Sequence, residues 1–180
     1  MCEHEDTPDP TCLLPTQPAK AQLKIVRMFE KDQVQFKWTK GPIVPKASFG
    51  TPADGAPVYG LCVYDQIAGT PALAVGAVAD GDGDCSDGAC WTESGSGWRL
   101  KNKLGAPSGI IAVKLQQGLV AGKSKVKVKM KGQALVAPSL PLANDPSVVA
   151  QVRSSDGQCY GAVFSTPIVN DDVAYRAKSD

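Results

Sequence analysis

The chain has little histidine, few aromatic residues and no long apolar run, and each shortage excludes a class of function. His4 is the single histidine among 180 residues, so a Ser–His–Asp triad, a Cys–His pair or a histidine-based zinc site is not expected. No apolar run approaches the ~20 residues of a transmembrane helix, so we expect no membrane span. Glycine-rich nucleotide motifs are also missing, and we expect that no cofactor is required.

The nearly equal numbers of basic and acidic residues argue against nucleic acid as a partner. Lys and Arg number 19 and Asp and Glu number 18, which gives a formal net charge of +1. A chain without a large charge excess is not held to nucleic acid by its overall field, so no nucleic-acid partner is expected.

Short alternating segments are present throughout the chain instead. Gly (18) and Pro (14) are abundant, and turn signals recur every 8–12 residues between segments of alternating apolar and polar side chains. This pattern predicts an all-β fold, an antiparallel two-sheet sandwich of immunoglobulin-like or jelly-roll-like type with nine or ten short strands. Residues 72–79, small and apolar on both faces, are expected to form either a central strand or a strand in a tight sheet contact.

Three segments make up the predicted domain organisation. Residues 1–20 hold four prolines and form an extended N-terminal segment, which we expect to be free to pair with a neighbour's sheet edge as a donated strand. Residues 21–175 form a single β-sandwich domain. Residues 176–180 form a polar tail.

The six cysteines predict a disulfide framework, because no CxxC pair suggests a metal site. Proximity along the chain favours pairing Cys2 with Cys12, Cys62 with Cys159 and Cys85 with Cys90, out of fifteen complete pairings. Disulfides persist in oxidising compartments, so we expect an extracellular or cell-surface protein. The opening "MCEHEDTPDP" shows no signal peptide, so we expect a signal already removed or a fragment of a longer exported chain.

Several of these segments together carry a resemblance to a known module. They are "KDQVQFKWTKGP", "YGLCVYD", the cysteine loop ending in "CW", "KVKVKMKG" and "VVAQVRSSDGQCYGAVFS". Over roughly residues 20–175 the chain resembles an uncharacterised β-sandwich module found in large exported bacterial proteins. The resemblance implies export and has no assigned activity, so it supplies no catalytic residues.

The stretch "DGDGDCSDGACW", residues 80–91, has two interpretations that are compatible with each other. Asp80, Asp82 and Asp84, with help from Asp87, have the alternate spacing of a calcium loop, although the EF-hand signature is incomplete. The other interpretation is a solvated acidic turn closed by the Cys85–Cys90 disulfide. Calcium is therefore the one metal that the sequence suggests.

A lysine stripe marks the segment "GKSKVKVKMKG", residues 122–132. On a strand its lysines point the same way, about 6.5–7 Å apart. One interpretation is an anion-binding face for an acidic polysaccharide, and another is a guard against edge pairing of an exposed strand. A third is head-to-tail self-assembly, with the acidic loop of another copy as partner. Because aromatic residues are missing from the stripe, base stacking is not expected. The stripe consists of Lys123, Lys125, Lys127, Lys129 and Lys131.

Three functions remain open from the sequence. The first is a non-catalytic structural or adhesive module, either a subunit of a surface assembly or part of a larger surface protein. The second is a calcium-assisted carbohydrate-binding module with exposed Trp91 and Trp98 as the sugar platform, whereas Trp38 is expected in the core. The third is a small carboxylate-dependent hydrolase, for which Asp65 and Glu93 are candidates. The absence of any catalytic motif favours a protein that is not an enzyme.

Overall fold

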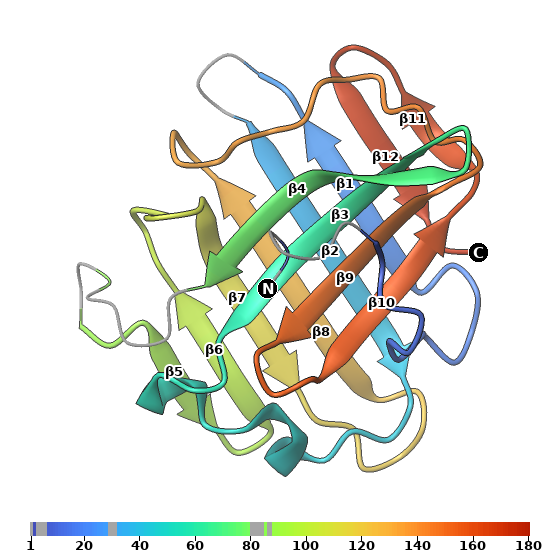
Figure 1. Ribbon diagram of the computed structural model, residues 1–180. Coiled ribbons are helices and arrows are strands. Elements are labelled where there is room, and N and C mark those ends of the chain that lie inside the picture. The colour runs from blue at the N-terminus through green and yellow to red at the C-terminus, as the bar shows by residue number, and fades with distance from the viewer. Residues whose placement is uncertain (1, 3–6, 29–31, 80–84, 86–87) are drawn as a thin grey trace.

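The computed structural model describes residues 2, 7–28, 32–79, 85 and 88–180, and strands dominate it (Figure 1). The first six strands are β1 (Ala21–Val26), β2 (Gln33–Gly41), β3 (Tyr59–Ile67), β4 (Thr70–Ala79), β5 (Trp91–Ser94) and β6 (Gly97–Lys101). The other six are β7 (Ile110–Gln116), β8 (Ser124–Lys131), β9 (Val148–Ser154), β10 (Cys159–Phe164), β11 (Pro167–Asn170) and β12 (Ala174–Lys178). Two 3₁₀ turns, η2 (Lys46–Phe49) and η3 (Pro52–Asp54), join β2 to β3. The described residues contain no helix that is long and apolar enough to cross a membrane.

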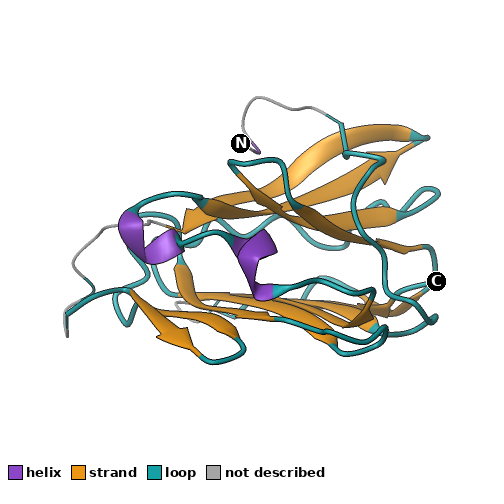
Figure 2. Cartoon of the chain, turned by 90° about the horizontal axis from the view of Figure 1, so that it is seen from below, coloured by secondary structure: helices purple, strands orange, loops and turns teal. Residues whose placement is uncertain are grey.

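The strands form two stacked antiparallel sheets, which confirms the predicted sandwich (Figure 2). The larger sheet has eight strands in the order β11-β12-β1-β2-β8-β7-β6-β5, and the smaller has four in the order β10-β9-β3-β4. The strands of the two sheets cross each other at a large angle (Figure 1). The structure has twelve strands rather than nine or ten, and the last part of the chain, residues 167–178, forms two of them, β11 and β12.

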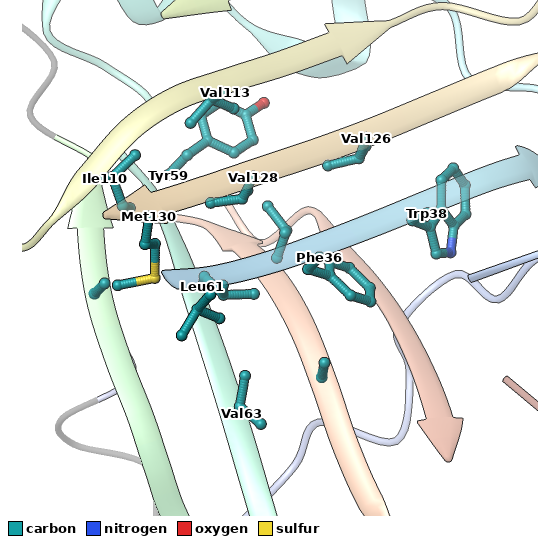
Figure 3. Packing of buried hydrophobic residues seen from close by; sticks show 14 of the residues in the cluster. Phe36, Trp38, Tyr59, Leu61, Val63, Ile110, Val113, Val126, Val128 and Met130 are labelled. Carbon is teal, nitrogen blue, oxygen red and sulfur yellow. The ribbon is translucent and has the colours of Figure 1, made fainter. Parts of the chain in front are cut away.

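The hydrophobic core fills the space between the sheets, and alternate residues of each strand supply it (Figure 3). In β2, Val34, Phe36 and Trp38 are fully buried, while the residues between them face outwards. Across the sheets, Phe36 packs edge-on against Phe164 with ring centroids 6.5 Å apart. Trp38 meets Tyr160 at 5.3 Å, so the expectation of a core tryptophan is confirmed.

The smaller sheet is also covered on its outer face. The N-terminal segment, meaning Cys2 and residues 7–20, contacts that face at Cys2, Asp9 and Cys12. It then passes the edge strand β10 and reaches the larger sheet, where the Thr16 N–H donates to the carbonyl of Lys40. At the edge of the smaller sheet Leu13 forms a parallel β-bridge with β10: the Leu13 N–H donates to the carbonyl of Cys159 at 2.9 Å, and the Leu13 carbonyl accepts from the N–H of Gly161 at 3.0 Å. Asp9 exchanges two hydrogen bonds with the side chain of Gln151, at 3.0 and 2.7 Å. Every residue of β9 is consequently buried.

Two disulfides fasten the N-terminal segment to the smaller sheet. They join Cys2 to Cys62 and Cys12 to Cys159, with Cα–Cα distances of 5.5 and 4.5 Å. The predicted pairs 2–12 and 62–159 are therefore wrong. Proximity along the chain misled, because each cysteine of the segment faces a different strand. The described part of the segment is bound to its own sheet. The expectation that it is free to pair with the sheet edge of a neighbour is therefore wrong.

The third disulfide, between Cys85 and Cys90, is confirmed, with a Cα–Cα distance of 5.0 Å. It closes a short loop immediately before β5, and Cys85 N–H donates to the carbonyl of Gly88 within that loop.

Two strands, β12 and β4, differ from the predictions. Residues 176–178 are not a tail but part of β12, where Arg176 and Lys178 alternate with the buried Tyr175 and Ala177. β4 is an edge strand rather than a central one. Val75, Ala77 and Ala79 pack on the core, whereas the other face approaches the N-terminal segment at Gly76. A Cβ at Gly76 would lie 3.6 Å from the Cβ of Cys2.

Candidate functional site

The lysine stripe lies in the middle of the larger sheet. β8 buries Ser124, Val126, Val128 and Met130 and turns the intervening lysines to the outer face. On either side it pairs with β2 and β7, so the interpretation of the lysines as guards of an edge strand is wrong. Lys123 is exposed and precedes β8.

The neighbouring strands continue the positive charge across the sheet. In the β-ladders Lys127 lies between Lys37 of β2 and Lys114 of β7, and Lys114 in turn lies opposite Arg99 of β6. Adjacent strands are about 4.8 Å apart, so these four side chains form a row of cations along the hydrogen-bonding direction. On the other side of β2, the ladder continues through Gln22 of β1 to Lys178 of β12.

We call the outward-facing side chains of the larger sheet the basic face. Glu93 is the single acidic residue in the eight strands of this sheet, and it pairs with Lys46 rather than with the basic face. None of the cations of the basic face forms an ion pair with a residue that the structure describes. The cations of the basic face are Lys24, Lys37, Arg99, Lys101, Lys114, Lys125, Lys127, Lys129, Lys131, Arg176 and Lys178.

The closely spaced cations at the centre of the basic face affect the pKa of Lys114. Partial desolvation, followed by repulsion from Arg99, Lys127 and Lys125, lowers the pKa of Lys114 below its ordinary value. An anion placed over the row would relieve the repulsion without displacing an existing acidic partner among the described residues. The arrangement is thus suited to binding an extended polyanion.

Sequence reasoning found only part of this face. The sequence has no acidic residue from Ser94 to Asn144, and this span contains the cations of β6, β7 and β8. The contribution of Lys24, Lys37 and β12 was missed, because it depends on which strands become neighbours. The available signal was that each of these cations alternates with buried apolar residues of its own strand.

The predicted sugar platform is absent. Trp91 and Trp98 are 3% and 6% exposed, so neither offers a ring to a ligand, and this prediction is wrong. Trp91 packs near Tyr59, and Trp98 lies below the ammonium of Lys46, which is 5.8 Å from its ring centroid. Both rings complete the core beside η2 and η3, because β5 and β6 bring them to the inner face of the sheet.

The predicted calcium ligands Asp80, Asp82, Asp84 and Asp87 lie outside the described residues, so calcium binding stays a prediction. Within the described part of the chain, one cluster has the composition of a metal site, namely Asp9 with Cys12 and Cys159. Its two sulfur atoms are joined in a disulfide and are not thiolate ligands, so the cluster is not a metal centre.

The two carboxylates considered for hydrolysis have structural partners. Asp65 accepts hydrogen bonds from the backbone N–H groups of Ala143 and Asn144, at 2.7 and 2.8 Å. It thereby anchors the long connection between β8 and β9. Glu93 is exposed and pairs with Lys46.

Fold and site together define a disulfide-fastened β-sandwich with one covered and one basic outer face. In comparisons with known proteins, no family model, no curated protein and no solved structure matches this chain.

Proposed function

We propose that this chain is a non-catalytic adhesive module of an exported protein, and that it binds an acidic polysaccharide through the basic face. The observation that carries the proposal is the imbalance of charge in the larger sheet, where the basic face has no acidic member. A chain of formal net charge +1 has thus concentrated its cations on one open surface.

The three disulfides support an extracellular location. Structural disulfides persist in oxidising compartments and are rare in the cytosol. Fastening the N-terminal segment by two of them suits a module that works outside the cell. The resemblance to modules of exported bacterial proteins is in keeping with this location.

The composition of the basic face favours an acidic polysaccharide over nucleic acid. Single-stranded nucleic acid is usually bound by stacking bases on exposed aromatic rings. All Phe, Tyr and Trp side chains among the described residues are buried, and the basic face carries lysine, arginine, glutamine and threonine instead. Flexible lysines tolerate variable spacing of carboxylate or sulfate groups along a polymer.

The test is equilibrium binding to immobilised alginate and dextran sulfate, with neutral dextran and single-stranded DNA as comparisons. We expect both acidic polysaccharides to bind, with an affinity that falls steeply as salt is raised. The double variant Lys114→Gln/Lys127→Gln should bind about tenfold more weakly, since each exposed charge contact contributes about 0.5–1 kcal/mol.

The matched control is Lys20→Gln/Lys40→Gln, which removes the same charge outside the paired rows of cations, since Lys20 precedes β1 and Lys40 lies at the register shift of β2. It should weaken binding by no more than about twofold. Equal losses in both variants, or no binding of either acidic polysaccharide, would contradict the proposal. Salt-sensitive self-assembly in place of polysaccharide binding would assign the basic face to copies of the chain.

A further inference from the structure

The structure shows one hollow beside Lys101 and Lys131 and another, lined by more cations of the basic face, over β1, β2 and β12. We consider the second hollow. The hollow has a volume of about 340 Å³ and lies over β1, β2 and β12, with Ile168 of β11 beside it. This volume lies at the small end of the range of ligand sites, which run from about 300 to 1,000 Å³.

Two adjacent rows of the sheet supply the polar lining. In one row Gln22 lies between Lys178 and Lys37, and in the next Lys24 lies between Arg176 and Gln35. The lining therefore holds four cations and two carboxamides within three neighbouring strands, at interstrand distances of about 4.8 Å.

No acidic residue lines the hollow, and none of its four cations has an ion-pair partner among the described residues. The positive charge is thus available to a ligand. The guanidinium of Arg176 has a planar fork that matches a carboxylate or sulfate group, whereas the ammonium groups act as point charges. Gln22 and Gln35 each offer an amide donor and a carbonyl acceptor to hydroxyl groups.

We propose that this hollow seats one acidic sugar unit, which carries a carboxylate or sulfate group, and so fixes the position of the polysaccharide on the basic face. This inference rests on the proposed function. The cations bind the acidic group, and the two carboxamides bind hydroxyl groups of the same or the adjoining ring. Ile168, which is 65% exposed, offers an apolar surface to one side of the sugar. The lysine stripe then attracts the rest of the chain through charge alone.

The experiment compares short and long ligands on two matched double variants. Lys24→Gln/Arg176→Gln removes two charges from the hollow, and Lys125→Gln/Lys129→Gln removes two from the stripe on the same face. The probes are a purified galacturonate tetramer, a sulfated oligosaccharide of similar length, and polymeric alginate.

We expect the hollow variant to lose about tenfold more affinity than the stripe variant for at least one of the short probes. The probe that responds tells a carboxylate from a sulfate. The polymer should lose affinity to a similar extent in both variants, because many charges share its binding.

A neutral substitution gives a readout that does not depend on charge. Gln22→Ala should weaken the short probe severalfold and leave the salt dependence of binding unchanged, since the net charge is constant. Equal losses in the hollow and stripe variants, with the polymer still bound by the wild type, would overturn this inference alone. If the wild type binds the polymer but neither short probe, this inference is overturned as well. If the wild type binds neither the polymer nor the short probes, the proposed function is overturned too.

Discussion

The smaller sheet presents its outer face to the N-terminal segment, whereas the larger sheet presents its outer face to solvent. On the first, Cys62, Tyr64 and Val149 are buried together with Cys2 in a small cluster of their own. On the second, the outward positions of the central strands β2 and β8 are taken by lysine, glutamine and threonine. Both sheets share the same core, so the difference lies only in what each strand turns away from it.

The two outer faces therefore differ in how much their side chains stabilise the fold. An apolar outer face requires a cover, and here two disulfides hold the cover in place. Like charges side by side contribute nothing to stability, and their repulsion opposes folding. A surface that keeps such charges unpaired is better explained by a ligand than by the fold.

The largest expected effect is on the covered face. Replacing both cysteines of the 12–159 disulfide by alanine should lower the free energy of unfolding by about 5 kcal/mol, because this bond spans 147 residues. The same change at the 85–90 disulfide, which spans 5 residues, should lower it by about 2 kcal/mol. Guanidinium unfolding of the two variants measures the difference. A larger loss at 85–90 would mean that the N-terminal segment contributes little to the stability of the smaller sheet.

A medium effect distinguishes two tyrosines of the smaller sheet, both buried and both with a raised pKa through desolvation. Tyr59 donates a hydrogen bond to the carbonyl of Phe49 at 2.9 Å, so Tyr59→Phe should destabilise by about 1–2 kcal/mol. The hydroxyl of Tyr160 has no hydrogen-bond partner among the described residues, so Tyr160→Phe should change stability by less than about 0.5 kcal/mol. Urea unfolding at neutral pH is the measurement. Equal losses in the two variants would contradict this account of how the covered sheet is held.

The smallest effect on stability is expected on the basic face. Lys127→Gln should leave the free energy of unfolding unchanged within about 0.5 kcal/mol, because it removes only a repelled surface charge. The pKa of Lys114 should rise towards its ordinary value, because Lys127 is one of the cations that lower it. An NMR titration of the lysine side chains measures this shift. Lys40→Gln is the control, and an equal response to it would show that the row does not act locally.

Alternation along each strand was sufficient to predict the sandwich and the core tryptophan Trp38. It also placed the lysines of residues 122–132 on one face. Alternation carries no information about which strands become neighbours, so the central position of β8 and the contribution of Lys37 to the basic face were not predictable. The predicted disulfide between Cys2 and Cys12 was wrong for the same reason. The true partners depend on which strands the N-terminal segment contacts, and alternation does not show this. Trp91 was misplaced because β5, at four residues, is too short to show which side of the sheet it buries.

We propose that ligand binds to the outer face of the larger sheet and not to the covered face of the smaller sheet. The most direct measurement is backbone amide NMR of the wild-type protein during titration with a short sulfated or uronate oligosaccharide. The account predicts that shift changes concentrate on β1, β2, β8, β7 and β12 and disappear at high salt. Changes concentrated on the N-terminal segment, β9 and β10, with the larger sheet unaffected, would contradict it.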